Sequence, residues 1–155
     1  MISLFMNSDD QLFDAALTRT CTTEEELGAV AAEVAAMLAA GEVVALSGPT
    51  GAGKTTFARA IVRALHNRDE GTSPTFTFRH RYDGDPPIEH LDFYRIAEHG
   101  DAAELGLEEA FDGDAVVIVE WWRNAPFLLP ARRWEIELEG SGDAPRRVAI
   151  SPPPP

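Results

Sequence analysis

The residues with the clearest chemistry lie between positions 48 and 56, where glycines, a lysine and two threonines come in close succession. The segment reads GPTGAGKTT and matches GxxxxGK[ST], the spacing of a phosphate-binding loop. Glycine at three of these positions lets the backbone curl until its N–H groups point at a phosphate chain. Lys54 then reaches the β- and γ-phosphates, and the Thr55 hydroxyl is placed to ligate Mg²⁺. The pattern predicts a nucleoside triphosphate site built from one run of residues: Gly48, Gly51, Ala52, Gly53, Lys54, Thr55 and Thr56.

Lys54 is the only lysine of the chain, and the remaining Lys-plus-Arg positions are all arginine. A compact ammonium with three rotatable donors suits a position between phosphates, whereas a planar guanidinium does not. A glycine turn with a solvated lysine is the alternative, but the apolar strand before the loop and the helix after it favour nucleotide binding.

Glu120 is the first acidic candidate for the metal. It follows the apolar run VVIV at residues 116–119, so its carboxylate is expected at the carboxyl end of a buried strand. Open α/β sheets bind ligands at that end. This is a Walker B placement, although aspartate is the more usual residue, and the longer side chain leaves open direct or water-mediated contact with Mg²⁺. An acid that ends a strand in solvent is the alternative.

The segment HLDFYR, which begins at His90, contains the second group of polar candidates. In an extended run His90 and Asp92 share a face, and Arg95 follows as the chain turns. Asp92 is predicted to orient water or to belong to the metal shell, and Arg95 to lie near phosphate or a partner. Alternatively, His90 and Asp92 hydrogen-bond to each other. A transition-metal site from these two residues and Glu120 is disfavoured beside a phosphate loop.

The elements that must position these residues alternate between strand and helix. Thr23 and Glu26 form a capping-box signature for a helix that ends at Gly41, and a second helix is predicted over residues 54–65. The turn at residues 83–87 predicts a hairpin between the strands on either side of it. Strands are predicted over residues 16–20, 43–47, 75–82, 88–92, 115–119, 133–138 and 147–150.

This order predicts an α/β fold of the P-loop NTPase-like three-layer type, with a central parallel sheet extended by antiparallel edge strands. The segments expected at edges are residues 16–20, 133–138 and 147–150. A length of 155 residues predicts one domain, residues 1–155, with a loosely ordered leader over 1–16 and a proline tail over 151–155.

The net charge of −13 and the pI near 4.6 disfavour strong direct binding to nucleic acid and binding to an anionic membrane. An acidic surface suits docking onto a basic partner, although solubility explains it equally well. A single cysteine, Cys21, excludes an internal disulfide and predicts a reducing compartment. With neither a signal peptide nor a membrane span in the pattern, the chain is expected to be cytoplasmic.

Several of these motifs, in this order along the chain, closely resemble the TsaE (YjeE) family, the ATPase component of bacterial tRNA threonylcarbamoyladenosine synthesis. They are the phosphate loop, SPTFT at residues 73–77, HLDFYR, Gly106 and Glu120-Trp121. The resemblance spans about residues 20–150, and SPTF followed by HxDxYR is far more specific than the phosphate loop alone. Two departures are Pro49-Thr50, where the family has Asp-Leu, and Trp122, where it often has proline.

The resemblance implies that Thr55 and Glu120 hold Mg²⁺ and that ATP is the nucleotide. It makes Asp92 the catalytic acid, beside Lys54, which the phosphate-loop motif already predicts to be catalytic. By the same analogy Cys21 lies near the adenine and Trp121 near the nucleotide. It also implies the TsaB and TsaD subunits as partners, in a complex reset by ATP hydrolysis. Switch positions are expected at Ser73, Thr75, His90, Tyr94 and Arg95.

Two other functions compete with this one. A small-molecule kinase of this size would need an acceptor pocket and arginines over the phosphates, and the paired arginines Arg132-Arg133 and Arg146-Arg147 lie in or beside predicted C-terminal strands. A nucleotide-gated adaptor would bind ATP without meaningful hydrolysis. GTP is disfavoured because the sequence contains no NKxD motif for guanine.

Overall fold

Seven strands and two α-helices form the part of the chain that the computed structural model describes, residues 17–67, 78–96 and 106–155. The helices are α1 (Glu24–Ala35) and α2 (Lys54–His66), and three short 3-10 helices are η1 (Leu107–Phe111), η2 (Trp122–Asn124) and η3 (Pro126–Leu128). The strands are β1 (Leu17–Cys21), β2 (Val43–Ser47), β3 (Arg79–Tyr82), β4 (Ile88–Asp92), β5 (Val116–Glu120), β6 (Trp134–Glu139) and β7 (Arg146–Ser151).

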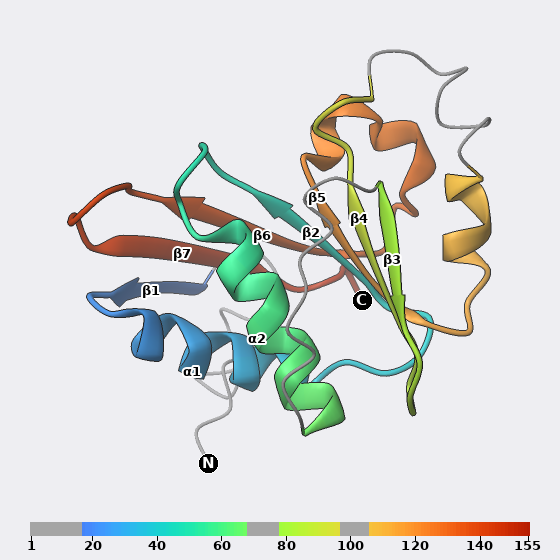
Figure 1. The fold of residues 1–155 in the computed structure, drawn as a ribbon, viewed down its shortest axis with the longest axis horizontal. Coiled ribbons are helices and arrows are strands. Elements are labelled where there is room, and N and C mark those ends of the chain that lie inside the picture. Colours follow the sequence, from blue (N-terminus) through green and yellow to red (C-terminus); the bar gives the residue numbers. More distant parts are fainter. Residues whose placement is uncertain (1–16, 68–77, 97–105) are drawn as a thin grey trace.

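The strands pair in the order β1-β7-β6-β2-β5-β4-β3 (Figure 1). The four central strands, β6, β2, β5 and β4, are parallel to one another, whereas β7, β1 and β3 pair antiparallel with their neighbours. The β3–β4 hairpin predicted around residues 83–87 is confirmed. The parallel centre with antiparallel additions confirms the predicted fold class.

The prediction that residues 133–138 and 147–150 form edge strands is wrong. β6 lies between β7 and β2 and is parallel to β2, and β7 lies between β1 and β6. The sheet edges within the described residues are β1, as predicted, and β3. Strand β6 alternates because its second face, with Glu135, Glu137 and Glu139, points away from the helices, and not because the strand lacks a neighbour.

Apolar side chains cover both faces of β2 and β5, the two strands in the middle of the sheet. On one face, α1 and α2 lie side by side (Figure 1) and pack on alternate strand residues such as Val44, Ile118 and Ile136. On the other face, Val119 and its neighbours pack against residues of η1 and the segment around η2, among them Leu107. This arrangement of three layers places one end of the strands beside α2, and the site forms at that end.

Helix α1 begins as its capping box predicts. The Thr23 hydroxyl accepts a hydrogen bond of 3.0 Å from Glu26 N–H. The Glu26 carboxylate reaches back one residue further than expected, to the N–H and hydroxyl of Thr22. These contacts lower the pKa of Glu26, since they favour its charged form. The helix ends at Ala35, short of the predicted end at Gly41.

Two predictions concern residues outside the described part: the leader 1–16 and the switch positions Ser73 and Thr75 in the segment 73–77. Near the other end of the sequence, Arg132 donates a hydrogen bond to the carbonyl of Pro154 in the proline tail. Among the described residues, no helix is both long and apolar enough to cross a membrane.

Candidate nucleotide-binding site

The carboxyl ends of β4 and β5 bring the two predicted acids together. Asp92 and Glu120 are register partners on these neighbouring parallel strands. Both lie on the same side of the pleat as Ile88 and Ile118, which face the α-helices. The two carboxylates therefore point toward the start of α2, where the phosphate loop ends.

The phosphate loop runs from β2 to α2 and requires glycine at specific points. Gly48 has φ +147°, and a Cβ on it would lie 2.4 Å from the carbonyl oxygen of Leu138 in β6. Gly53 is the N-cap of α2 with φ +100°, a left-handed conformation that side chains disfavour. The loop therefore packs closely on β6 before it enters the helix.

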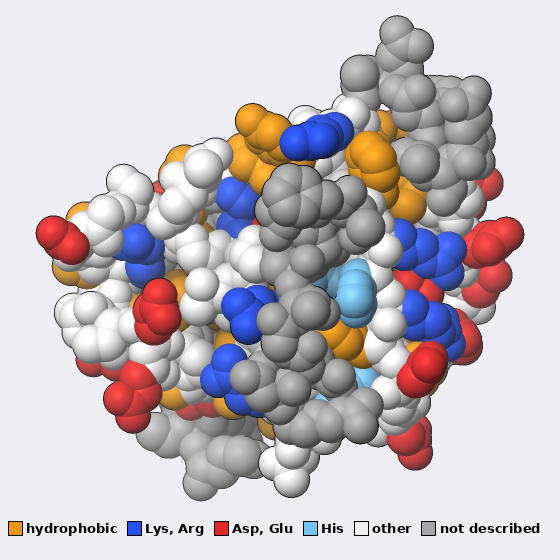
Figure 2. All heavy atoms as spheres, in the orientation of Figure 1, with side chains coloured by type: hydrophobic (Ala, Val, Ile, Leu, Met, Phe, Trp, Pro, Cys, Tyr) orange, Lys and Arg blue, Asp and Glu red, His pale blue; other side chains and the backbone are white. Residues whose placement is uncertain are grey.

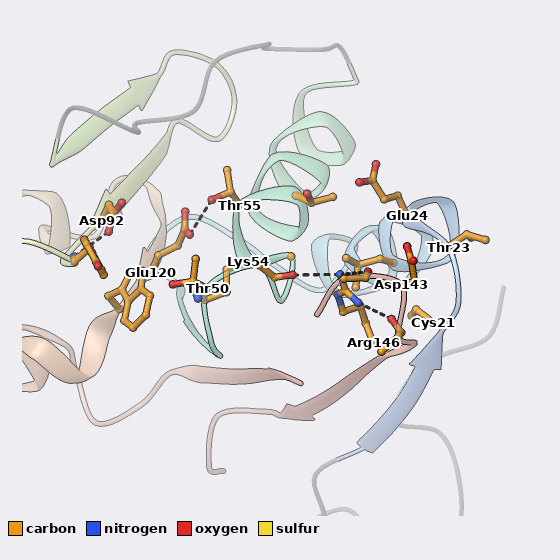
Figure 3. Close-up of a pocket in the computed structure, with 18 of the residues that line it drawn as sticks. Cys21, Thr23, Glu24, Thr50, Lys54, Thr55, Asp92, Glu120, Asp143 and Arg146 are labelled. Carbon is orange, nitrogen blue, oxygen red and sulfur yellow. Dashed lines mark hydrogen bonds between the residues drawn. The ribbon is translucent and has the colours of Figure 1, made fainter. Parts of the chain in front are cut away.

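A cavity of about 780 Å³ extends along this loop (Figure 3). Asp92 and Glu120 lie at one end of it, Lys54 and Thr55 in the middle, and Cys21 with Arg146 at the other end. Its lining combines the N-terminus of α2, with a partial positive charge, and side chains of both signs. Such a site suits an elongated anionic ligand.

Lys54 lies in the floor of the cavity and is only 6% exposed. Its ammonium donates hydrogen bonds to the carbonyls of Gly48, at 2.5 Å, and Pro49, at 3.0 Å. The ammonium also lies 4.2 Å from the ring centroid of Trp121. Burial lowers the pKa of Lys54, while Glu120 and Asp92 act in the opposite direction. Lys54 is therefore held by neutral acceptors that a phosphate group can replace.

Glu120 connects α2 to β4 through its two carboxylate oxygens. Oε1 accepts a hydrogen bond of 3.0 Å from the Thr55 hydroxyl, and Oε2 lies 2.7 Å from Nε2 of His90. His90 is fully buried and Glu120 is 4% exposed, so Glu120 is not a solvated strand-end acid. His90 pairs with Glu120 and not with Asp92, so the alternative of a His90–Asp92 hydrogen bond is wrong.

The Thr55–Glu120 pair fits a magnesium ion. Mg²⁺ takes oxygen ligands at about 2.0–2.1 Å in an octahedron, so two adjacent ligands lie about 3 Å apart. This is the observed separation of the hydroxyl and carboxylate oxygens. Among the described residues, no group of three or more His, Cys, Asp or Glu side chains is placed to hold a metal ion, so the protein would supply only the Thr55 hydroxyl and the Glu120 carboxylate to Mg²⁺.

Asp92 is half-buried beside this pair. Its Oδ1 accepts a hydrogen bond of 2.9 Å from the N–H of Tyr94. Burial raises the pKa of Asp92, and the negative charge of Glu120 adds to the rise, while the Tyr94 N–H opposes it. Tyr94 also packs against Trp121 with ring centroids 4.9 Å apart, which places one aromatic pair at this end of the cavity.

Comparison with known proteins agrees with this geometry. The family model described as "Threonylcarbamoyl adenosine biosynthesis protein TsaE" matches residues 21–148. The tRNA threonylcarbamoyladenosine biosynthesis protein TsaE of Bacillus subtilis is 38% identical over 128 residues, which is 82% of this chain and 80% of that protein. The chain belongs to the TsaE family.

Further TsaE relatives support the assignment. The Streptomyces coelicolor protein of the same name is 44% identical over 126 residues, covering 76% of this chain and 84% of that protein. The crystal structure of Bacillus subtilis YdiB matches with a TM-score of 0.71 and 35% identity, covering 86% of this chain and 83% of that one. The resemblance inferred from the motifs and the P-loop NTPase-like fold are both confirmed.

Most of the site residues predicted from the sequence line the cavity, and a few do not. Gly48 and His90 do not line it but contact residues that do, Gly48 through its carbonyl to Lys54 and His90 through Nε2 to Glu120. Ala52 is fully buried, and its N–H donates to the carbonyl of Pro49. Cys21 lines the cavity but is 2% exposed, and burial raises its thiol pKa. The predicted residues that line it are Cys21, Gly51, Gly53, Lys54, Thr55, Thr56, Asp92, Tyr94, Arg95, Glu120 and Trp121.

The turn between β6 and β7 contributes residues that the sequence did not single out for this site. Gly142, Asp143, Ala144 and Arg146 line the cavity at the end near Cys21. From the sequence, Arg146 is expected only in or beside a C-terminal strand. The antiparallel pairing of Arg146 with Cys21 brings it there, and no local pattern in the sequence carries that information.

Proposed function

We propose that this chain is a Mg²⁺-dependent ATPase that supports N6-threonylcarbamoyladenosine modification of tRNA by binding and resetting a TsaB–TsaD complex. The observation that carries the proposal is the shared cavity in which Lys54 and Thr55 of the phosphate loop face the carboxylates of Asp92 and Glu120. The family assignment supplies the pathway. A role in tRNA modification agrees with the cytoplasmic location expected from the sequence.

Each polar side chain has a separate task in this proposal. The N–H groups of the phosphate loop and Lys54 bind the phosphates, and Lys54 gives up its two carbonyl contacts to do so. Thr55 and Glu120 would hold Mg²⁺, which supplies charge neutralisation on the β- and γ-phosphates. His90 fixes the orientation of the Glu120 carboxylate.

Asp92 acts on the attacking water. Tyr94 N–H engages Oδ1, so Oδ2 orients the water and accepts its proton. The raised pKa of Asp92 makes its carboxylate a stronger base than one in solvent. The paired aromatic rings of Tyr94 and Trp121 line this end of the cavity, where they would limit the access of other water molecules to the phosphates.

Titration calorimetry with Mg·ATP tests the binding step. Lys54→Ala is expected to weaken binding by at least about a hundredfold, because it removes the only ammonium facing the phosphates. Arg63→Ala is the matched control, since it removes one positive charge from the exposed side of the same helix and should bind as the wild type does. Equal affinity of Lys54→Ala and the wild type, or no uptake of Mg·ATP with TsaB and TsaD present, would refute the proposal.

Single-turnover hydrolysis tests the chemical step. Asp92→Asn keeps the acceptor for Tyr94 N–H, so we expect Mg·ATP affinity within about threefold of wild type and a turnover lower by a factor of about 10² or more. The nucleotide-gated adaptor makes the opposite prediction, since it would function without turnover. Phosphorylation of a small-molecule acceptor in a substrate screen would instead favour the kinase.

The purified chain alone is expected to hydrolyse ATP slowly. P-loop enzymes that lack an arginine finger turn over at about 10⁻⁴ per second, and a partner can raise this by up to about 10⁵-fold. Arg146 does not act as a finger, because it lies at the opposite end of the cavity from Asp92 and Glu120 (Figure 3). Adding TsaB and TsaD should therefore accelerate hydrolysis, and brisk turnover of the isolated chain would contradict this part of the proposal.

A further inference from the structure

Arg146, at the start of β7, is a cavity-lining cation whose charge no acid in the described residues neutralises. Its guanidinium donates three hydrogen bonds, all to backbone carbonyls: Nη2 to Gly51 at 3.2 Å and Gly142 at 3.1 Å, and Nη1 to Ala144 at 2.5 Å. No ion pair of Arg146 occurs within the described part of the chain. In a protein of net charge −13, this leaves a positive charge directed at the ligand cavity.

The contact with Gly51 fixes one peptide unit of the phosphate loop from both sides. Arg146 holds the C=O of the Gly51–Ala52 peptide, and the carbonyl of Pro49 accepts from its N–H at 3.1 Å. In a trans peptide these two groups point in opposite directions, so the two bonds together set the plane. Gly51 is exposed, and the space around its Cβ position is open to 4 Å. On the Gly51 side of this peptide the position therefore depends on hydrogen bonds, whereas on the other side the fully buried Ala52 packs in the core.

The position of Arg146 also determines which part of a nucleotide it can face. Figure 3 shows Arg146 and Asp143 on the far side of Lys54 from Glu120 and Asp92. With the metal and terminal phosphate at the Thr55–Glu120 end, the nucleoside end of the ligand extends toward Arg146. A guanidinium there acts equally on ATP and ADP, because it does not reach the γ-phosphate.

We propose that Arg146 is a positioning residue of the nucleotide site, which locks the Gly51–Ala52 peptide of the phosphate loop from the β6–β7 turn. In addition, it presents a positive charge to the nucleoside end of the bound nucleotide. The inference rests on the proposed function, since it assumes that the cavity binds Mg·ATP. A preformed loop binds its ligand more tightly because less ordering accompanies binding.

Arg146→Gln tests the proposal, with Arg147→Gln as the matched control. Both variants lose one positive charge at adjacent positions, but Arg147 is exposed and does not line the cavity. We expect Arg146→Gln to weaken Mg·ATP and Mg·ADP binding by about tenfold each and to raise KM while kcat stays within twofold. Arg147→Gln should change none of these values by more than twofold. Arg146→Lys, which keeps the charge, should recover part of the affinity.

Hydrogen exchange of the ligand-free protein separates a local lock from general destabilisation. The Ala52 amide should exchange at least about tenfold faster in Arg146→Gln, while amides of the central strand β5 keep their protection. Equal nucleotide affinity in the two glutamine variants, or unchanged protection of Ala52, would overturn the inference while leaving the proposed function intact. If the wild-type chain itself does not bind Mg·ATP, the proposed function fails and the inference fails with it.

Discussion

At the residue scale, the half-buried carboxylate of Asp92 is maintained at the expense of stability. Its raised pKa means that the folded protein holds the proton more tightly than the unfolded chain does. Stability therefore falls as the pH rises from the ordinary pKa of aspartate through the raised one, and above that window the burial of an ionised group remains unfavourable. A neutral side chain of the same shape should remove this unfavourable contribution to the stability.

We expect Asp92→Asn to raise the melting temperature of the ligand-free protein by about 2 °C at pH 7, even though the variant loses turnover. The gain should shrink as the pH falls and disappear below about pH 4, where aspartate is protonated in both states. Calorimetric scans across this pH range provide the measurement. Asp112→Asn, at an exposed position with the same change in charge, should shift the melting temperature by less than about 1 °C. A destabilised Asp92→Asn protein would contradict this account.

Individual site residues were predictable where a local sequence motif specifies their chemistry. Lys54 and Thr55 follow from a local motif, and Glu120 from its place after an apolar strand. The partner of His90 was not predictable in the same way. His90 and Asp92 are two residues apart on one strand, but the nearer acceptor belongs to β5, and only the parallel register of β4 with β5 brings it within 2.7 Å.

At the element scale, helix α1 contains a glycine that its structure does not require. Gly28 lies in the middle of the helix, and a Cβ on it would meet no atom within 4 Å. Gly28→Ala is therefore expected to stabilise the protein by about 0.5–1 kcal/mol, because alanine loses less backbone freedom on folding. Denaturant unfolding measures the change.

The same substitution at Gly48 is the matched comparison. Its Cβ would lie 2.4 Å from Leu138 O, at a φ of +147°, so Gly48→Ala should destabilise the fold and displace the phosphate loop. A shift of stability in the same direction for both variants would contradict this prediction. It would mean that the close packing of Gly48 against β6 does not distinguish the two glycines.

Element types were more predictable than element neighbours. The capping residues of α1 and the apolar run of β2 reveal helix and strand directly. In β6, however, alternation reports only that one face is polar, and the central place of this strand depends on its pairing with β2 far away in the sequence. The contribution of the β6–β7 turn to the cavity was hidden for the same reason.

At the scale of the whole molecule, charge is distributed in a way that disfavours binding to a polyanion. On the face drawn in Figure 2, acidic side chains lie along both sides and the basic ones are scattered between them. Some arginines are already engaged: the fully buried carboxylate of Glu89 accepts hydrogen bonds from Arg79 at 2.8 Å and from Arg81 at 3.0 Å. These cations are therefore compensated within the protein.

The chain alone is expected not to bind tRNA measurably at about 10 μM protein and physiological salt, because a net charge of −13 opposes counterion release from a phosphate backbone. Electrophoretic mobility shift with and without TsaB and TsaD tests this. Complexes should form only when the subunits are present. Salt-dependent binding by the isolated chain would contradict this prediction, and would show that arginines other than Arg79 and Arg81 form an effective basic surface.

The β6–β7 turn closes one end of the cavity, and this has a consequence for biosynthesis. A ribosome that has translated the phosphate loop must continue through β6 and into β7 before Arg146 exists to hold Gly51. The nascent chain thus emerges with this contact of its phosphate loop still missing. The affinity of the site for the nucleotide should reach its full value only after the last hairpin has docked.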